Sequence, residues 1–221
     1  MFSRTKQLIG DNFDKLKKSS VIVFGVGGVG GYVVEMLVRS GIEKITIVDF
    51  DNVDITNINR QIIALNSTIG KPKVEAMTSR VMDINPNAQI IAINKKLLPE
   101  NIESFNLAGY DYVIDCIDMV TSKIALIEYC FKNNIKIISA MGAGNRKCIP
   151  EFCVADIYST YNDGLARVMR RELKKRDVTK HMVVFTKNIA EVSGENIGSI
   201  AYYPSMCGCV LSAYVINELI K

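Results

Sequence analysis

Apolar runs rich in valine and isoleucine recur along the first two-thirds of the chain, separated by longer amphipathic segments. Runs without polar alternation are typical of strands that helices cover on both faces. We expect strands at 20–25, 43–49, 88–94, 110–118 and 135–144, and helices at 28–40, 71–85 and 122–134. This alternation predicts an α/β fold with a doubly wound, mainly parallel sheet and right-handed crossovers.

The pattern changes in the last third of the chain. We expect strands at 151–158 and 182–186, a helix in the basic segment 167–176, and a final apolar helix at 206–220. No internal repeat or linker is visible in the sequence. We therefore interpret 1–221 as a single Rossmann-like domain whose C-terminal part, 151–221, adds antiparallel strands to the sheet.

Composition narrows the class of protein. The chain is 48% hydrophobic and 23% charged, which is ordinary for a globular protein. Residues 1–18 alternate charges with isolated apolar residues, which predicts an amphipathic helix and not a targeting segment. No apolar run approaches the roughly 18 residues of a membrane span. The six cysteines include no C-x-x-C pair, so we expect free thiols, no zinc site and a cytoplasmic location.

A glycine-rich turn follows the first expected strand. Gly25, Gly27 and Gly30 satisfy G-x-G-x-x-G between a strand and a helix, and Asp49 ends the next strand, 19 residues after Gly30. Glycine lets the backbone approach a phosphate, and an acid at this spacing can accept hydrogen bonds from ribose hydroxyls. The alternative is a glycine turn that only packs the helix on the strand.

The residues after the second strand favour a triphosphate over a dinucleotide. Arg60, Lys71 and Lys73 supply several cations, and Asp118 follows the fourth strand, where a carboxylate can hold Mg²⁺ beside phosphates. The only histidine, His181, lies far along the chain, and we interpret it as a strand residue and not as the acid of a hydride transfer. The sequence therefore predicts an enzyme that splits ATP.

Four separated motifs resemble one family. The segments "GVGGVG", "IVDFDNVDITNINRQ", "GKPKVE" and "DCID" are similar in order and spacing to the ubiquitin-activating-enzyme-like superfamily, the adenylating enzymes ThiF, MoeB and HesA. That family adenylates carboxylates with Mg-ATP. For this chain the resemblance implies a nucleotide site formed by Gly25, Gly27, Gly28, Asp49, Asp51 and Asn57. It also implies that Arg60 and Lys73 bind the triphosphate, that Asp118 binds magnesium, and that Arg4 reaches the partner's site in a homodimer.

Other segments resemble the branch of the superfamily that acts on RNA. Members that activate ubiquitin-like proteins commonly carry two C-x-x-C pairs, which this chain lacks. The segments "TSKIALIEYC", "MGAGN", "VADIYST" and "DGLARVMRRELKKR" are similar to the tRNA threonylcarbamoyladenosine dehydratases. The resemblance implies ATP-dependent dehydration of that nucleoside in tRNA, with ring closure, through carboxylate adenylation. The expected partners are tRNA, a second copy of the chain and a sulfur-relay protein. The alternatives are adenylation of the C-terminal glycine of a ubiquitin-like sulfur carrier, and a nucleotide-binding regulatory module without catalysis.

Positive charge is concentrated in one block. Residues 167–176 carry six bases and one acid, or +5, whereas the whole chain carries +4. On a helix, one face would carry Arg167, Arg170, Arg171 and Lys174, and the apolar Leu165, Val168, Met169 and Leu173 would fall mostly on the other side. This arrangement predicts binding of the tRNA backbone. The alternative is a face that contacts only solvent.

Overall fold

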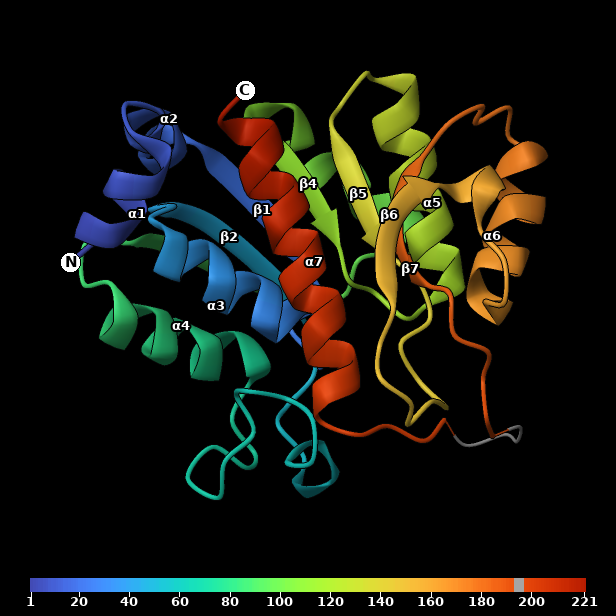
Figure 1. Ribbon diagram of the computed structural model, residues 1–221, viewed down its shortest axis with the longest axis horizontal. Coiled ribbons are helices and arrows are strands. Elements are labelled where there is room, and N and C mark those ends of the chain that lie inside the picture. The colour runs from blue at the N-terminus through green and yellow to red at the C-terminus, as the bar shows by residue number, and fades with distance from the viewer. Residues whose placement is uncertain (193–196) are drawn as a thin grey trace.

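The computed structural model describes residues 1–192 and 197–221 and contains a sheet with the strand order β3-β2-β1-β4-β5-β7-β6 (Figure 1). The strands are β1 (Ser20–Phe24), β2 (Lys44–Asp49), β3 (Gln89–Asn94), β4 (Tyr112–Asp115), β5 (Ile137–Ala140), β6 (Phe152–Asp156) and β7 (Met182–Thr186). All neighbours pair in parallel except β6 and β7, which are antiparallel. The expected fold class is confirmed.

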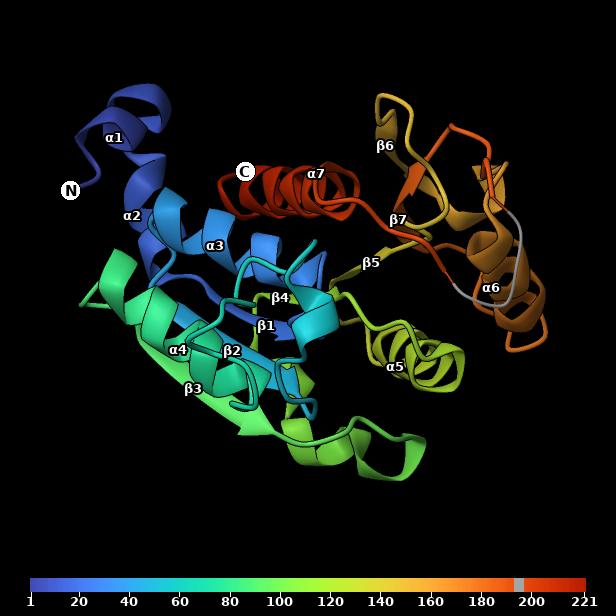
Figure 2. The same cartoon turned by 90° about the horizontal axis from the view of Figure 1, so that it is seen from below.

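Helices cover both faces of the sheet (Figure 2). One face carries α3 (Gly30–Ser40), α4 (Lys73–Ile84) and α7 (Tyr202–Leu219). The other carries α5 (Val120–Lys132) and the 3-10 turns at Pro99–Phe105 and Leu107–Gly109. The helix α6 (Gly164–Lys174) packs beside α5 and against β7. Valine and isoleucine of β1 and β2 therefore contact apolar residues above and below, which explains the absence of polar alternation.

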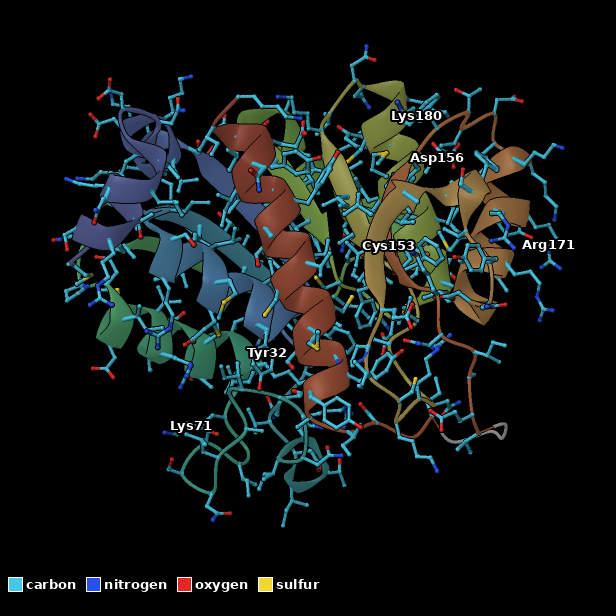
Figure 3. The ribbon with its side chains drawn as sticks, in the orientation of Figure 1. Tyr32, Lys71, Cys153, Asp156, Arg171 and Lys180 are labelled. Carbon is cyan, nitrogen blue, oxygen red and sulfur yellow. The ribbon has the colours of Figure 1, made fainter. Side chains whose placement is uncertain are left out.

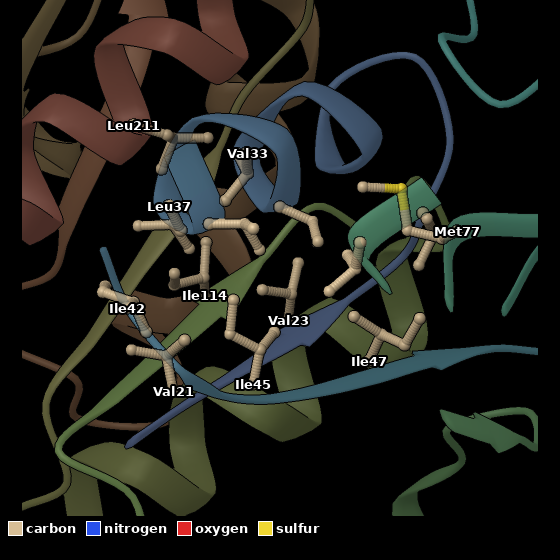
Figure 4. Packing of buried hydrophobic residues seen from close by; sticks show 14 of the residues in the cluster. Val21, Val23, Val33, Leu37, Ile42, Ile45, Ile47, Met77, Ile114 and Leu211 are labelled. Atoms are coloured by element: carbon tan, nitrogen blue, oxygen red, sulfur yellow. The ribbon is translucent and has the colours of Figure 1, made fainter. Parts of the chain in front are cut away.

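The main core lies between the sheet and the pair α3 and α7 (Figure 4). Val33 and Leu37 of α3 and Leu211 of α7 are fully buried there together with Val21 and Val23 of β1. Removing one such side chain from a close-packed core typically costs about 2–5 kcal/mol. This packing fixes the start of α3, where the glycine-rich turn lies.

The helix α7 lies very close to α3. A Cβ added at Gly208 would come within 2.6 Å of the Val29 carbonyl oxygen and 2.9 Å of Tyr32 Cβ. Because a Cβ atom essentially never lies this close to a non-bonded heavy atom, only glycine permits this approach of the two helices. The helix begins at Tyr202, four residues earlier than its apolar run suggests.

The first residues form two helices and not the single one that the sequence predicts. They are α1 (Ser3–Ile9) and α2 (Asn12–Lys18). Gly10 has φ +58° and ends α1, because this left-handed conformation cannot continue a right-handed helix. Phe13 and Leu16 bury α2 on the core, whereas α1 has no buried residue.

Two further properties follow from the fold. In the described ranges, no helix combines the length and the apolar composition that crossing a membrane requires. All six cysteines are free, including the fully buried Cys130 and Cys207.

Candidate active site

The glycine-rich turn joins β1 to α3 in a conformation that needs glycine. Gly25 has φ +85°, and a Cβ there would lie 2.8 Å from the Cys116 carbonyl oxygen. A Cβ at Gly30 would collide with the Gly25 carbonyl oxygen at 1.8 Å. The turn is thus pressed against the end of β4 and folded back on itself. Its backbone N–H groups stand at the start of α3, where the helix dipole favours an anion.

Asp49 holds this turn in place. Its side chain is 9% exposed, and its Oδ2 accepts a 2.7 Å hydrogen bond from the Val26 N–H. Its Oδ1 accepts a second bond, of 2.9 Å, from the Asp51 N–H. The carboxylate therefore ties the glycine turn to the end of β2. This positioning role accompanies the ribose contact that the sequence predicts, since each oxygen retains a further lone pair.

A cavity of about 550 Å³ opens at the carboxyl edge of the parallel strands. This edge is where ligands bind in open α/β sheets. The cavity brings together eight residues that the sequence singled out: Gly25, Gly27, Gly28, Asp49, Asp51, Arg60, Lys73 and Asp118. Residues separated by more than ninety positions in the chain thus share one site.

Both predicted phosphate-binding cations are held at the cavity by other groups. Lys73, at the first position of α4, is 7% exposed, and its Nζ lies 2.8 Å from Asp51 Oδ2. Arg60 donates from Nη1 to the Thr56 carbonyl and to Asn59 Oδ1, both at 2.9 Å. Holding the side chains in advance reduces the entropy lost when an anion binds.

Asp118 is exposed in the loop after β4. The loop is fixed by Asp115, which is fully buried and whose Oδ1 accepts a 3.0 Å hydrogen bond from the Ile117 N–H. Asp115 Oδ2 lies 2.7 Å from Nζ of Lys123, also fully buried. Magnesium is usually held by one or two carboxylates together with phosphates and water, and Asp118 fits that donor set. Among the described residues, no group of three or more His, Cys, Asp or Glu side chains could hold a metal alone.

Several lining residues were missed by the sequence analysis. Lys95 and Lys96 follow β3, and Lys96 Nζ lies 5.0 Å from the centroid of the Phe50 ring. Gln61 is buried, and its Oε1 has no hydrogen-bond partner among the described residues. Their place in the sequence, directly after a parallel strand, could have predicted that Lys95 and Lys96 line the cavity. All parallel strands end at the same edge of the sheet, and that edge is where ligands bind.

The loop after β5 and the C-terminal third also contribute to the cavity, a contribution that the sequence did not predict. The loop provides Met141, Gly142, Ala143 and Gly144, and the C-terminal third provides Leu165, Ile197, Ser199 and Pro204. A Cβ at Gly28 would lie 3.3 Å from Pro204 Cβ, so the start of α7 contacts the glycine turn directly.

Asn57, Lys71 and Arg4 are among the residues that the sequence singled out but that lie outside this lining. Asn57 is buried in the 3-10 turn Ile55–Asn57, and its Oδ1 accepts a 3.1 Å hydrogen bond from the Asp54 N–H. Lys71 is exposed on the loop before α4 (Figure 3). Arg4 is exposed on α1 and lines a separate depression with Arg39 and Ile84. Neither Lys71 nor Arg4 reaches the cavity of its own chain.

The basic helix α6 carries fewer free cations on one face than the sequence suggests. Arg167, Arg171 and Lys174 are exposed, and Arg171 points away from the molecule in Figure 3. Arg170 is half-buried and donates from Nη1 to the Thr160 carbonyl at 2.9 Å. It departs from the expected face because it lies on the same stripe as the buried Ala166, Met169 and Leu173.

Glu172 offsets part of the charge of α6. It forms ion pairs with Lys175, Arg171 and Arg176. Hydrogen bonds from Lys175, then Arg171 and Arg176, lower the pKa of Glu172 to about 2. The carboxylate therefore stays ionised at any physiological pH, and Arg167 and Lys174 form no ion pair within the described ranges.

Comparison with known proteins agrees with this geometry. The family model described as "ThiF family" matches residues 2–220. The chain belongs to the ThiF family. A ThiF-family relative from Bacillus subtilis (strain 168), named tRNA threonylcarbamoyladenosine dehydratase, is 40% identical over an alignment covering 100% of this chain and 94% of the relative.

Two further ThiF-type proteins bear on the site. The crystal structure of the E. coli tRNA N6-threonylcarbamoyladenosine dehydratase TcdA in complex with ATP superposes with a TM-score of 0.93 at 32% identity, covering 99% of this chain and 93% of that one. A molybdopterin-synthase adenylyltransferase from Salmonella typhimurium is 33% identical over 63% of this chain and 57% of its own length. The similarity to the dehydratases thus extends further along the chain.

Proposed function

We propose that this protein is an ATP-dependent tRNA threonylcarbamoyladenosine dehydratase, which adenylates the carboxylate of that nucleoside and closes it into a ring. The observation that carries the proposal is the 40% identity to a dehydratase over the whole chain, including the C-terminal third. The glycine turn, Asp49 and the held cations provide the nucleotide site that such a reaction needs.

The chemistry divides into two steps. The carboxylate oxygen attacks the α-phosphorus of ATP, the bond to the bridging oxygen breaks, and pyrophosphate leaves. A nucleophile of the same modification then attacks the activated carbonyl, loses its proton and expels AMP. The nucleoside loses the elements of one water: the carboxylate oxygen leaves in the phosphate of AMP, and the proton of the nucleophile is released. Because the nucleophile is intramolecular, the enzyme needs no cysteine, and burial raises the pKa of the cavity thiol of Cys116.

Charge on the phosphates is the main obstacle to the first step, and the described residues meet it. The backbone of Gly25, Gly27 and Gly28, which lines the cavity, would contact the phosphates, while Arg60 and Lys73 would neutralise the leaving pyrophosphate. Asp118 would hold Mg²⁺, which supplies a Lewis acid at the phosphate oxygens. Asp49 and Asp51 bind the nucleoside end, and Asn57 supports them indirectly by fixing the 3-10 turn.

We also propose a homodimer in which Arg4 of one subunit completes the partner's site. Support comes from the position of Arg4, which is exposed and lies away from the cavity of its own chain. The six free cysteines suit a reducing compartment, so we propose the cytoplasm, where tRNA is also found. A sulfur-relay protein is a further proposed partner. The tRNA backbone would contact the exposed cations of α6.

The second candidate is activation of a ubiquitin-like sulfur carrier, favoured by the 33% identity to a molybdopterin-synthase adenylyltransferase. One experiment separates it from the dehydratase and from a regulatory nucleotide-binding module. The protein is incubated with ATP and with tRNA that bears or lacks the modification, and the nucleosides are analysed by mass spectrometry. We expect loss of one water mass from the modified nucleoside only. Pyrophosphate exchange that requires a carrier protein instead of tRNA would contradict the proposal, as would no exchange at all.

A further inference from the structure

Three loops of the cavity are each fixed by a buried aspartate. Asp49 holds the glycine turn after β1, and Asp115 holds the loop after β4 that carries Asp118. The third is Asp163, which is 5% exposed and holds the loop after β5. The first two loops belong to the nucleotide site, whereas the proposed function does not yet assign a role to the third.

Asp163 links two parts of the molecule. Its Oδ2 accepts a 2.9 Å hydrogen bond from the Gly142 N–H, and its Oδ1 accepts another, also of 2.9 Å, from the Ala166 N–H in the first turn of α6. A Cβ added at Gly142 would lie 3.1 Å from Oδ1 of this carboxylate. The loop after β5 and the start of the basic helix are therefore held by one side chain.

Arg146 fixes the same loop from the other side. It is 7% exposed, and its guanidinium donates to four backbone carbonyls. The distances are 3.3 Å to Gly142, 2.9 Å to Gly144, 2.9 Å to Asn162 and 2.9 Å to Asn188. Asp163 thus accepts a hydrogen bond from the Gly142 N–H, and Arg146 donates one to the Gly142 carbonyl. Because both backbone groups are bound, this segment has little freedom to move.

The order of the strands tells which part of the substrate this loop meets. Along the edge β3-β2-β1-β4-β5, the cavity is lined in turn by Lys95 and Lys96, Asp49 and Asp51, the glycine turn, Asp118 and the loop 141–144. If ribose lies at Asp49 and the phosphates lie between the glycine turn and Asp118, the loop after β5 is next beyond the phosphates. In this arrangement the attacking carboxylate can approach from the side of that loop. Gly142, Ala143 and Gly144 leave room for it, and Leu165 of α6 lines the same part.

We propose that Asp163 is a positioning residue for the acceptor, which fixes the loop 142–144 as the acceptor-side wall of the cavity and joins it to the tRNA-binding helix α6. This inference rests on the proposed function and specifies how the acceptor reaches the nucleotide. Docking of tRNA on α6 is then coupled to placement of the nucleoside's carboxylate beside ATP. The coupling arises because the Asp163 side chain holds both α6 and the loop 142–144.

The test replaces Asp163 in two ways. In Asp163→Asn one oxygen remains, so either the Ala166 N–H or the Gly142 N–H loses its acceptor. In Asp163→Ser the hydroxyl can still cap α6, since serine is a favoured N-cap, but is too short to reach Gly142 as well. We expect kcat of tRNA-dependent AMP formation to fall about 10- to 100-fold in both variants. The KM for ATP and the Kd for tRNA should stay within about twofold, because neither binding surface contains Asp163.

The matched control is Asp156→Asn. Asp156 has the same double arrangement, since Oδ1 accepts from the Tyr158 N–H at 2.9 Å and Oδ2 accepts from the His181 N–H at 3.2 Å. It lies at the end of β6, outside the cavity lining (Figure 3). We expect this variant to lower the melting temperature about as much as Asp163→Asn does, with kcat within about twofold of the wild type.

The outcomes are distinguishable. If the wild type forms AMP only with modified tRNA and both Asp163 variants keep its kcat, the positioning role is overturned and the proposed function stands. If kcat falls equally in Asp156→Asn, or if kcat and both binding constants change together, Asp163 is only structural and the inference is overturned. If the wild type shows no tRNA-dependent AMP formation, the proposed function fails and the inference fails with it.

Discussion

His181 is buried directly before β7, with Nε2 2.8 Å from Ser139 Oγ. Burial, together with the cation of Lys123, lowers the pKa of its imidazole from 6.5 to about 3. The folded protein therefore keeps this side chain neutral over a pH range in which the unfolded chain would protonate it. The sequence analysis placed His181 in a strand and gave it no catalytic role, and the structure places it one residue before β7, outside the cavity lining.

This burial predicts a pH dependence of stability. Between pH 6.5 and pH 3 the unfolded state binds one more proton at this site than the folded state does, so the free energy of unfolding falls as the pH falls. The slope from His181 alone is at most about 1.4 kcal/mol per pH unit. We expect His181→Gln to remove this contribution between pH 6.5 and 5. Urea unfolding at several pH values measures the slope, and an unchanged slope in the variant would contradict the prediction. His181 is the only histidine, so no other imidazole obscures the result.

At the residue scale, the sequence predicted the site residues that lie close together along the chain. Gly25, Gly27 and Asp49 lie within one strand–helix–strand unit, and the pattern predicted that they share one site, as the cavity lining shows. Asp163 and Arg146 gave no such signal, because their hydrogen bonds go to backbone groups up to 42 residues away. A carboxylate that accepts from a remote N–H is indistinguishable in sequence from any other N-cap aspartate.

At the element scale, α6 shows the limit of helical periodicity. The spacing correctly placed a helix with a buried apolar stripe, but it could not show that Arg170 donates to Thr160 or that Glu172 binds three cations. Of the four expected residues, Arg167, Arg171 and Lys174 are exposed and can meet an anion, although Arg171 is also paired with Glu172.

Changing these three residues to glutamine tests whether the face meets phosphates. If all three do, the slope of log K for tRNA against log salt concentration should shrink by roughly 2 to 3, at about 0.7–0.9 for each phosphate that the helix no longer neutralises. Folding should survive, because the apolar stripe is untouched.

The charge-matched control changes Lys15, Lys17 and Lys18 of α2 to glutamine, which removes three exposed cations far along the chain from α6. This control should leave the slope near that of the wild type. Equal effects of the two triple variants would show that tRNA affinity follows net charge and not the face of α6.

At the scale of the whole molecule, the fold class and the place of every strand followed from hydrophobic pattern, because uninterrupted apolar runs are typical of strands that helices cover on both faces. The edge strand β3 is an exception, because its run is apolar although its residues are exposed or half-buried. Two other features did not follow from this pattern. They are the split of the first helix at Gly10 and the contribution of residues near Pro204 to the cavity wall. Both depend on how distant elements pack, which no local pattern encodes.

The proposed dimer predicts complementation between two inactive variants. Arg4→Ala would disable the partner's site, and Asp118→Asn would disable the site of its own subunit. In a mixed dimer one site would keep both residues and the other would lack both. With random exchange of subunits, about a quarter of wild-type activity should return. If subunit exchange is shown independently and activity still does not return, Arg4 either acts within its own chain or has no role in the reaction.

The close approach of α7 to the glycine turn has a consequence for biosynthesis. Pro204 supports Gly28, and Gly208 lets α7 lie against the first turn of α3, so the glycine turn is completed by residues more than 170 positions further along the chain. A nascent chain that ends before Tyr202 has the strands and the phosphate-binding motif but not the helix that covers them. Nucleotide affinity should therefore arise only after α7 has been synthesised and packed on α3, although the strands and the phosphate-binding motif are synthesised before it.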